Sequence, residues 1–255
     1  MSSEAGQRPP RSAWSTLGAW LRELAIVVVG ALIASTLLRL FIAQMFVIPS
    51  GSMEHTLEVS DRVAVQKVAG WDRGDVVVFR DTQDWLDLDD TDPGWLRQAL
   101  IFVGLAPDES TRHLIKRVIG VPGDHVTCCD AQGRLTVNGV ALNEVAYLYT
   151  DAATGKQVDP STMQFDIVVP AGHIFVMGDH RNGSKDSRCY LFDETDGPPG
   201  SLAFIPTENV IGSAIAIVFP FDRMRALSRP DTFGGIPPGG TPPSEPVING
   251  PPIDC

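Results

Sequence analysis

The sequence predicts a mainly β fold behind a single N-terminal membrane-spanning helix. Two observations support this prediction. A long apolar run near the N-terminus carries almost no charge, and behind it come short runs rich in valine and isoleucine. Glycine, proline or aspartate breaks these runs, in segments such as GWDRGD, GVPGD and VNGV. Short apolar runs bounded by turn residues are typical of strands in folded sheets.

The apolar run extends from Leu24 to Ile48, and its only charged residue is Arg39. Twenty-five residues of helix span about 37 Å, which is enough to cross a bilayer core of roughly 30 Å. We therefore expect a cytoplasmic segment at 1–23 and a transmembrane anchor at 24–45. Arginines precede the run and acidic residues follow it, which places the N-terminus in the cytoplasm and the rest outside a single-pass cell membrane. A buried core helix and a cleaved signal peptide are the alternatives.

The β domain is expected over residues 46–229. Its predicted strands are Arg62–Lys67, Asp75–Arg80, Leu114–Ile119, His125–Thr127, Arg134–Val137, His173–Met177 and Ile211–Phe219. Two insertions interrupt it, at about 81–113 and 143–165. The first insertion begins with six aspartates and no basic residue in 81–94, and then offers a short helix over Trp95–Leu105.

The last segment, 230–255, holds eight of the twenty prolines and five glycines. This composition predicts a tail that is disordered or extended.

The composition excludes several classes of function. Twenty basic residues against 31 acidic ones give a net charge of −11, so no nucleic-acid partner is expected. The five histidines show no ligand spacing and the four cysteines lack the pairing of a zinc site, so neither a metal nor a cofactor is expected.

Three segments carry residues suited to catalysis. The first is PSGSM (49–53), directly behind the anchor, where a turn can lift a hydroxyl clear of the backbone and present a second hydroxyl to an oxyanion. Its structural alternative is a helix-exit turn capped by serine.

The second segment is LIKRVI (114–119), followed by GVPGD. An apolar neighbourhood in a strand disfavours the charged form of Lys116, and a catalytic lysine needs its pKa lowered by about three units. The alternative is an edge-strand lysine with its amine in water.

The third segment is GDHRNGSKDSR (178–188), which follows the apolar run IFVM. Its density of polar groups exceeds what a turn requires, and it suits a hydrogen-bonded floor under an active site. A charged hairpin loop is the alternative.

Together these segments, with the strand RGDVVVF (73–79), resemble the bacterial type I signal peptidases, from the anchor to about residue 223. The resemblance implies a membrane-anchored endopeptidase with a signal-peptidase-like β domain, which removes signal peptides of exported preproteins through a serine–lysine dyad. Ser52 matches the nucleophile, Lys116 the general base and Ser50 the oxyanion-hole hydroxyl. Ser184 matches the residue that orients the lysine by a hydrogen bond. The remaining matches support the site: Asp179, Asp186, Arg117 and Arg188.

The resemblance also implies cleavage after small residues in an A-x-A pattern, close to the lipid bilayer, with a secretion translocon as a candidate partner. The pockets for those small residues would be lined by Phe46, Ile48, Pro49, Met53, Leu57, Val63, Leu114 and Ile115. Ordinary core packing is the alternative for these apolar residues. His55, His180 and Asn182-Gly183 depart from the usual family pattern in supporting positions.

Two other functions stay open at this point. One is a non-catalytic anchored β domain for adhesion or cell-wall contact, and the other is a self-cleaving regulatory serine–lysine protease. The cysteines allow three pairings. A bridge from Cys189 to Cys128 or Cys129 is one candidate, and free buried thiols are the other.

Overall fold

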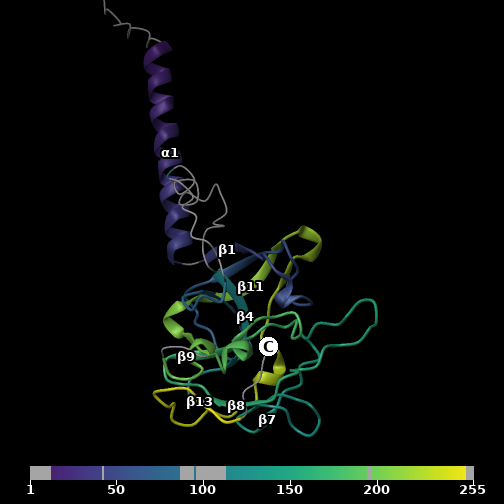
Figure 1. Ribbon diagram of the computed structural model, residues 1–255. Coiled ribbons are helices and arrows are strands. Elements are labelled where there is room, and N and C mark those ends of the chain that lie inside the picture. The colour runs from purple at the N-terminus through teal and green to yellow at the C-terminus, as the bar shows by residue number, and fades with distance from the viewer. Residues whose placement is uncertain (1–12, 42, 87–94, 96–112, 194–196, 251–255) are drawn as a thin grey trace, which may run out of the picture.

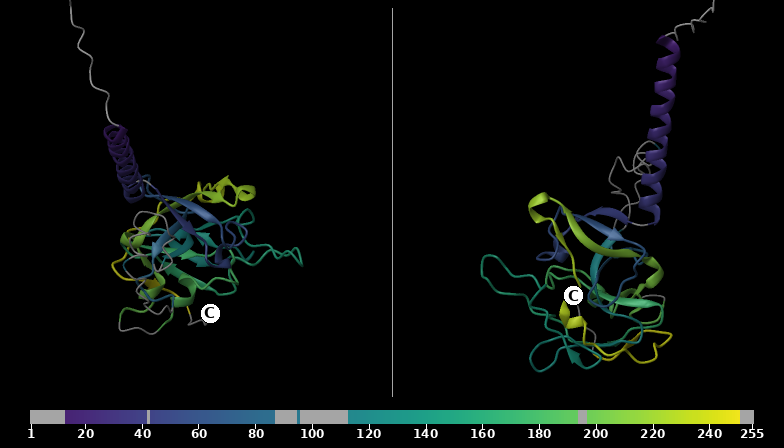
Figure 2. Two further views of the ribbon diagram at one scale, coloured as in Figure 1. Left: turned by 90° about the horizontal axis from the view of Figure 1, so that it is seen from above. Right: turned by 180° about the vertical axis from the view of Figure 1, so that it is seen from behind.

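The computed structural model describes residues 13–41, 43–86, 95, 113–193 and 197–250. Helix α1 (Ala13–Phe41) projects from a body of antiparallel strands (Figure 1), and it stands clear of that body in the views of Figure 2 as well. Its large apolar side chains face outward, with Trp20 72% and Leu24 60% exposed. Within the described residues, no helix has both the length and the apolarity needed to cross a bilayer. The transmembrane helix predicted for 24–45 is therefore not found.

The larger of the two sheets has eight strands in the order β1-β2-β11-β3-β4-β9-β10, with β12 paired to β11. The pairings are antiparallel throughout. Its strands are β1 (Ala43–Val47), β2 (Arg62–Gln66), β3 (Val76–Arg80), β4 (His113–Gly120), β9 (His173–Met177), β10 (Ile205–Pro206), β11 (Val210–Phe219) and β12 (Arg225–Ala226).

The smaller sheet has five strands in the order β13-β8-β5-β6-β7. These are β5 (His125–Cys128), β6 (Thr136–Val137), β7 (Val140–Ala141), β8 (Phe165–Val168) and β13 (Val247–Ile248). One core cluster joins the two sheets and includes Val77, Phe79, Val126 and Ile167. Strand β3 also contributes Val76 and Val78 to a second core cluster, because alternate side chains of a strand point to opposite faces.

The mainly β class is confirmed, and each of the seven predicted runs overlaps a strand, but only the last two residues of Arg134–Val137 belong to β6. The short strands β1, β7, β8, β10, β12 and β13 were not predicted. Strand β1 corrects the C-terminal boundary of the anchor at residue 45: helix α1 ends at Phe41, and Ala43 begins a strand whose backbone pairs with β2. The expected helix Trp95–Leu105 lies outside the described residues, apart from Trp95.

Of the two states predicted for the tail, disorder is wrong for residues 230–250. Phe233 is buried in the core that joins the sheets, and β13 pairs with β8. Gly240 N–H donates to Gly123 O, 3.0 Å away, and Ala171 N–H donates to Pro243 O. Figure 1 shows this yellow segment running along the smaller sheet. Prolines lack an N–H donor but keep their carbonyl acceptors, so a proline-rich strap is still held by hydrogen bonds.

The candidate bridge from Cys189 to Cys128 or Cys129 is also wrong, because Cys128 and Cys129 are joined to each other. Free thiols are not found among the described cysteines. The bridged pair lies at the end of β5, and the described bridge therefore ties no distant segments together.

We predict that Phe233→Ala lowers the free energy of unfolding by about 3 kcal/mol, since it removes a buried aromatic ring. Urea denaturation of the full chain measures this. Phe221→Ala is the matched control, because Phe221 is 78% exposed and its removal should cost about 1 kcal/mol or less. Equal effects of the two substitutions would mean that the tail does not pack on the domain.

Candidate active site

Ser52 lies in a single 3₁₀ turn, η1 (Gly51–Met53), that follows the extended residue Ser50. Glu54 N–H donates to Gly51 O at 3.0 Å and closes the turn. Ser52 is only 7% exposed, and Met53 is fully buried. The Ser50 hydroxyl makes no capping hydrogen bond to the turn, and Ser50 is exposed. The turn therefore places Ser52 inside the domain and leaves Ser50 exposed to solvent.

Lys116 is on β4, where its Cα pairs with that of Val77 on β3. The residue is 3% exposed. Its Nζ donates a hydrogen bond to Ser52 Oγ at 2.6 Å. The structure therefore brings together the two residues that the sequence assigns as base and nucleophile, across 64 positions of chain.

Burial lowers the pKa of Lys116 from its ordinary value to about 8. Loss of hydration is the largest cause, because it penalises the charged ammonium. Asp186 and Asp179 oppose the change by favouring the ammonium, and Arg188 adds to it. With this pKa, roughly a tenth of the amine is neutral at pH 7, against about one in 2,500 for an ordinary lysine.

The loop after β9 lies against the serine turn. His180 N–H donates to Ser52 O at 3.1 Å. A Cβ added to Gly178 would lie 2.3 Å from Ser184 Oγ and 2.4 Å from Ser52 O, so only glycine fits there. Ser184 is buried in this contact, but among the described residues its hydroxyl finds no hydrogen-bond partner. The expected hydrogen bond from Ser184 to Lys116 is therefore not formed.

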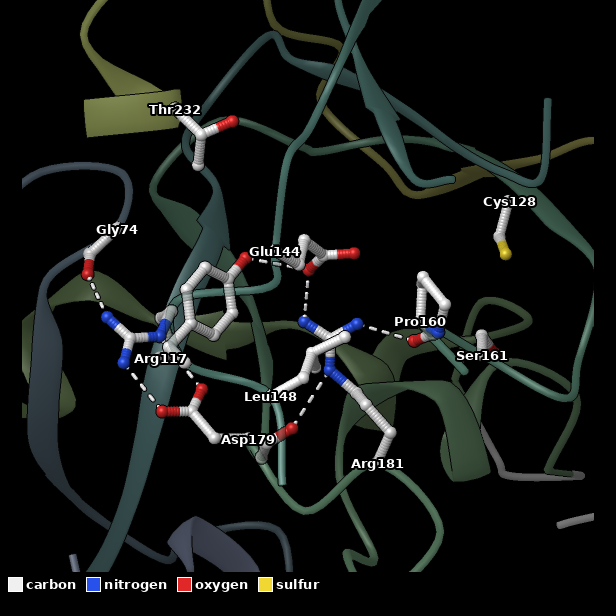
Figure 3. A network of polar contacts seen from close by, with 12 residues as sticks. Gly74, Arg117, Cys128, Glu144, Leu148, Pro160, Ser161, Asp179, Arg181 and Thr232 are labelled. Atoms are coloured by element: carbon white, nitrogen blue, oxygen red, sulfur yellow. Dashed lines mark hydrogen bonds and ion pairs between the residues drawn. The ribbon is translucent and has the colours of Figure 1, made fainter. Parts of the chain in front are cut away.

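Arg117, the neighbour of the lysine, holds the start of this loop. Its guanidinium donates two hydrogen bonds to Asp179, at 2.8 and 2.6 Å, and a third to Gly74 O at 2.6 Å (Figure 3). Thr56, four residues after Ser52, also donates to Asp179. Asp179 thus joins the serine turn, the lysine strand and the loop through one buried carboxylate.

Asp186 and Arg188 form a second buried pair within the loop, with contacts of 2.8 and 2.9 Å. Asp186 also accepts the N–H of Gly178 at 2.9 Å. Arg188 donates to Arg181 O at 2.7 Å, which closes the loop on itself. The loop therefore carries both carboxylates, Asp179 and Asp186, whose charges act on Lys116.

Sequence reasoning missed three further members of this network. Arg181 donates to Gly178 O and forms a buried ion pair with Glu144 (Figure 3). Tyr147 donates its hydroxyl to Glu144 and covers the guanidinium of Arg117, 4.3 Å from the ring centre. Arg181 was visible in the third motif, whereas Glu144 and Tyr147 lie in the second insertion, and no spacing in the sequence links them to the loop.

Most of the expected substrate-contacting residues lie in the second core cluster. Met53, Leu57 and Val63 have no exposed surface, and Ile115 is 7% exposed. Phe46 and Leu114 are partly buried, and Pro49 is exposed. Five of the eight belong to the cluster itself: Ile48, Met53, Leu57, Val63 and Ile115. In the described part of the chain, no group of three histidine, cysteine, aspartate or glutamate side chains is placed to hold a metal ion.

A buried serine hydrogen-bonded to a lysine of lowered pKa is the arrangement of serine–lysine hydrolases. The family model described as "Signal peptidase, peptidase S26" matches residues 21–219. The chain is 38% identical to a signal peptidase I of Mycobacterium tuberculosis, covering 80% of this chain and 74% of the relative. It is 30% identical to signal peptidase I U of Bacillus subtilis, covering 79% and 88%. The chain therefore belongs to the signal peptidase S26 family, and it is a signal peptidase enzyme.

Gly178→Ala is expected to reduce peptidase activity by roughly a hundredfold, because the added methyl group displaces Ser184 or the Ser52 carbonyl by several tenths of an ångström or more. Initial rates on a cleavable peptide measure the loss. Gly235→Ala is the control, since no atom lies within 4 Å of its added Cβ. Full activity of the Gly178 variant would show that the loop is not tightly seated on the turn.

Proposed function

We propose that this chain is a membrane-anchored endopeptidase that removes N-terminal signal peptides from exported preproteins, with Ser52 as nucleophile and Lys116 as general base. The observation that carries the proposal is the buried 2.6 Å contact between Lys116 Nζ and Ser52 Oγ. Membership of the signal peptidase family supports the substrate class.

In the proposed reaction, neutral Lys116 takes the proton of Ser52 Oγ as that oxygen attacks the peptide carbonyl. The tetrahedral intermediate collapses to an acyl-enzyme, and the lysine passes its proton to the leaving amine. Lys116 then takes a proton from a water molecule, which hydrolyses the ester and frees the serine. The dyad needs neither a metal nor a cofactor for these steps.

The oxyanion would be held by the backbone N–H of Ser52 and the hydroxyl of Ser50. Ser50 is exposed beside the turn and is not used as a cap, which leaves its hydroxyl free of the turn's own hydrogen bonds. One such donor is worth about 3–4 kcal/mol of transition-state stabilisation in serine proteases.

Substrate binding is proposed at the surface formed by Phe46, Pro49 and Leu114, over a floor of Ile48 and Ile115. The remaining assigned residues, Met53, Leu57 and Val63, would fix the shape of that floor from within the core. Asp179, Asp186, Arg117 and Arg188 would hold the dyad, while Ser184 would contact the lysine only after its hydroxyl rotates or shifts.

The exposed apolar side chains of α1 support membrane anchoring through the segment that begins at Leu24. A helix that leaves its leucines and valines uncovered by the domain needs another apolar environment. The arginines before it favour a cytoplasmic N-terminus and an extracytoplasmic β domain. Signal peptides, the lipid bilayer and a secretion translocon are the proposed partners, with cleavage after small residues in the A-x-A pattern.

We expect Ser52→Ala and Lys116→Ala each to lower preprotein cleavage by roughly a thousandfold or more. The assay incubates detergent-solubilised protein with an exported precursor and identifies the new N-terminus. Ser228→Ala and Lys156→Ala alter exposed residues of the same types and serve as controls. Cleavage by either dyad variant at the wild-type rate would exclude this dyad. No cleavage by the wild-type protein itself would favour a non-catalytic anchored domain. Cleavage of a preprotein added in trans separates the proposal from a protease that cuts only itself.

The pH dependence tests the state of Lys116. Because the neutral amine is the active form, kcat/KM should rise with pH through about 8 and then level off, following the lowered pKa. Initial rates measured between pH 5 and 11 (a range chosen for the assay) give the midpoint of this rise in kcat/KM. A midpoint near 10.4, the value of an ordinary lysine, would contradict the burial of this amine.

A further inference from the structure

The turn that carries Ser52 has few hydrogen bonds of its own. Besides the closing bond to Gly51 O, Met53 O accepts from the N–H groups of Thr56 and Leu57. Among the residues that the structure describes, the lysine strand β4 donates no hydrogen bond to the carbonyls of Gly51 or Ser52. The position of the nucleophile therefore depends on contacts from another segment.

His180 supplies those contacts with both its backbone and its ring. Its N–H donates to Ser52 O at 3.1 Å. Its ring Nδ1 lies 3.2 Å from Gly51 O and 2.9 Å from Glu54 Oε2. Two successive carbonyls of the serine turn and the first side chain after it are thus bound by one residue of the loop that follows β9.

The location of the ring proton follows from these neighbours. Gly51 O and a carboxylate oxygen can only accept a hydrogen bond, so Nδ1 must carry the hydrogen in this arrangement. The ring is stacked on Tyr149, with 3.9 Å between ring centres, and a Cβ added to Gly183 would lie 2.9 Å from the ring's Cε1 and Nδ1. The side chains of His180 and Glu54 are 19% and 28% exposed, so the contact is largely sheltered from water.

Glu54 also contacts the turn, and it can fold over the turn because Gly51 has no side chain. A Cβ at Gly51 would lie 2.5 Å from Glu54 Oε1, so the carboxylate folds closely over the turn. We infer that His180 is a positioning residue for Ser52: with Glu54 it clamps the turn Gly51–Met53 and keeps Ser52 Oγ within reach of Lys116. The inference rests on the proposed role of Ser52 as nucleophile. His180 does not touch the reacting atoms, so its effect must act through the turn.

The test compares His180→Asn, His180→Gln and His180→Ala in the full-length solubilised protein. The asparagine amide nitrogen is attached two bonds beyond Cβ, as Nδ1 is, whereas the glutamine nitrogen matches Nε2. We expect kcat to fall roughly tenfold in the glutamine and alanine variants, the size of one lost hydrogen bond, with KM within about twofold of wild type. The asparagine variant should restore kcat to within about threefold.

Two further variants make the comparison specific. Glu54→Gln keeps the shape but removes the charge, and its effect on kcat should not add to that of His180→Ala, since both act on one contact. His125→Gln is the matched control, because His125 pairs with Asp166 on the smaller sheet, away from the turn.

The inference is overturned if the glutamine and alanine variants keep kcat within twofold of wild type, or if asparagine is no better than glutamine. It is equally overturned if the loss appears in KM alone. Ser52→Ala run in parallel distinguishes the causes: if that variant stays active, the proposed nucleophile itself is wrong. Should the alanine variant fail to fold, the asparagine–glutamine comparison decides.

Discussion

The site depends on keeping one lysine amine out of water while two carboxylates lie close to it. Removing water favours neutral Lys116, and the charges of Asp186 and Asp179 favour its protonated form. Each carboxylate is bound by its own arginine, Asp186 by Arg188 and Asp179 by Arg117. Arg188 also lowers the pKa of Lys116, and burial has the largest effect, so that pKa stays low. Arg188 thus tunes the proposed base as well as holding the loop.

The same ion pairs also fix the positions of the chain segments that carry Ser52, Lys116 and the loop after β9. A buried carboxylate with two or three donors is costly to disturb, because any displaced partner leaves a charge without compensation. Asp179 binds a threonine that follows the serine turn and an arginine of the lysine strand, and the Gly178 N–H is bound by Asp186. The 2.6 Å contact between Ser52 and Lys116 is therefore supported by nearby residues on each of these segments.

Periodicity within short stretches of chain predicted the larger strands, whereas the meeting of Ser52 with Lys116 was implied by the family that the three motifs resemble. The rest depended on contacts between distant segments. Phe233 is buried against Gly74, over 150 residues earlier, and its ring lies 6.2 Å from that of Tyr147. Composition alone left that segment as disordered or extended. Likewise, Ala43, Gln44 and Met45 fall within the largely hydrophobic run, and only their pairing with β2 shows that the helix has already ended.

That early end of the helix bears on where the chemistry takes place. Ser52 lies eleven positions after Phe41, the last residue of α1. A chain of that length reaches at most about 40 Å when fully extended, and here five of its residues are committed to β1, paired with β2. Under the proposed anchoring, Ser52, the proposed nucleophile, is held by a short, sheet-bound connection instead of a flexible linker. Its height above the lipid is then set by the fold, which suits a scissile bond that lies just beyond the apolar segment of its substrate.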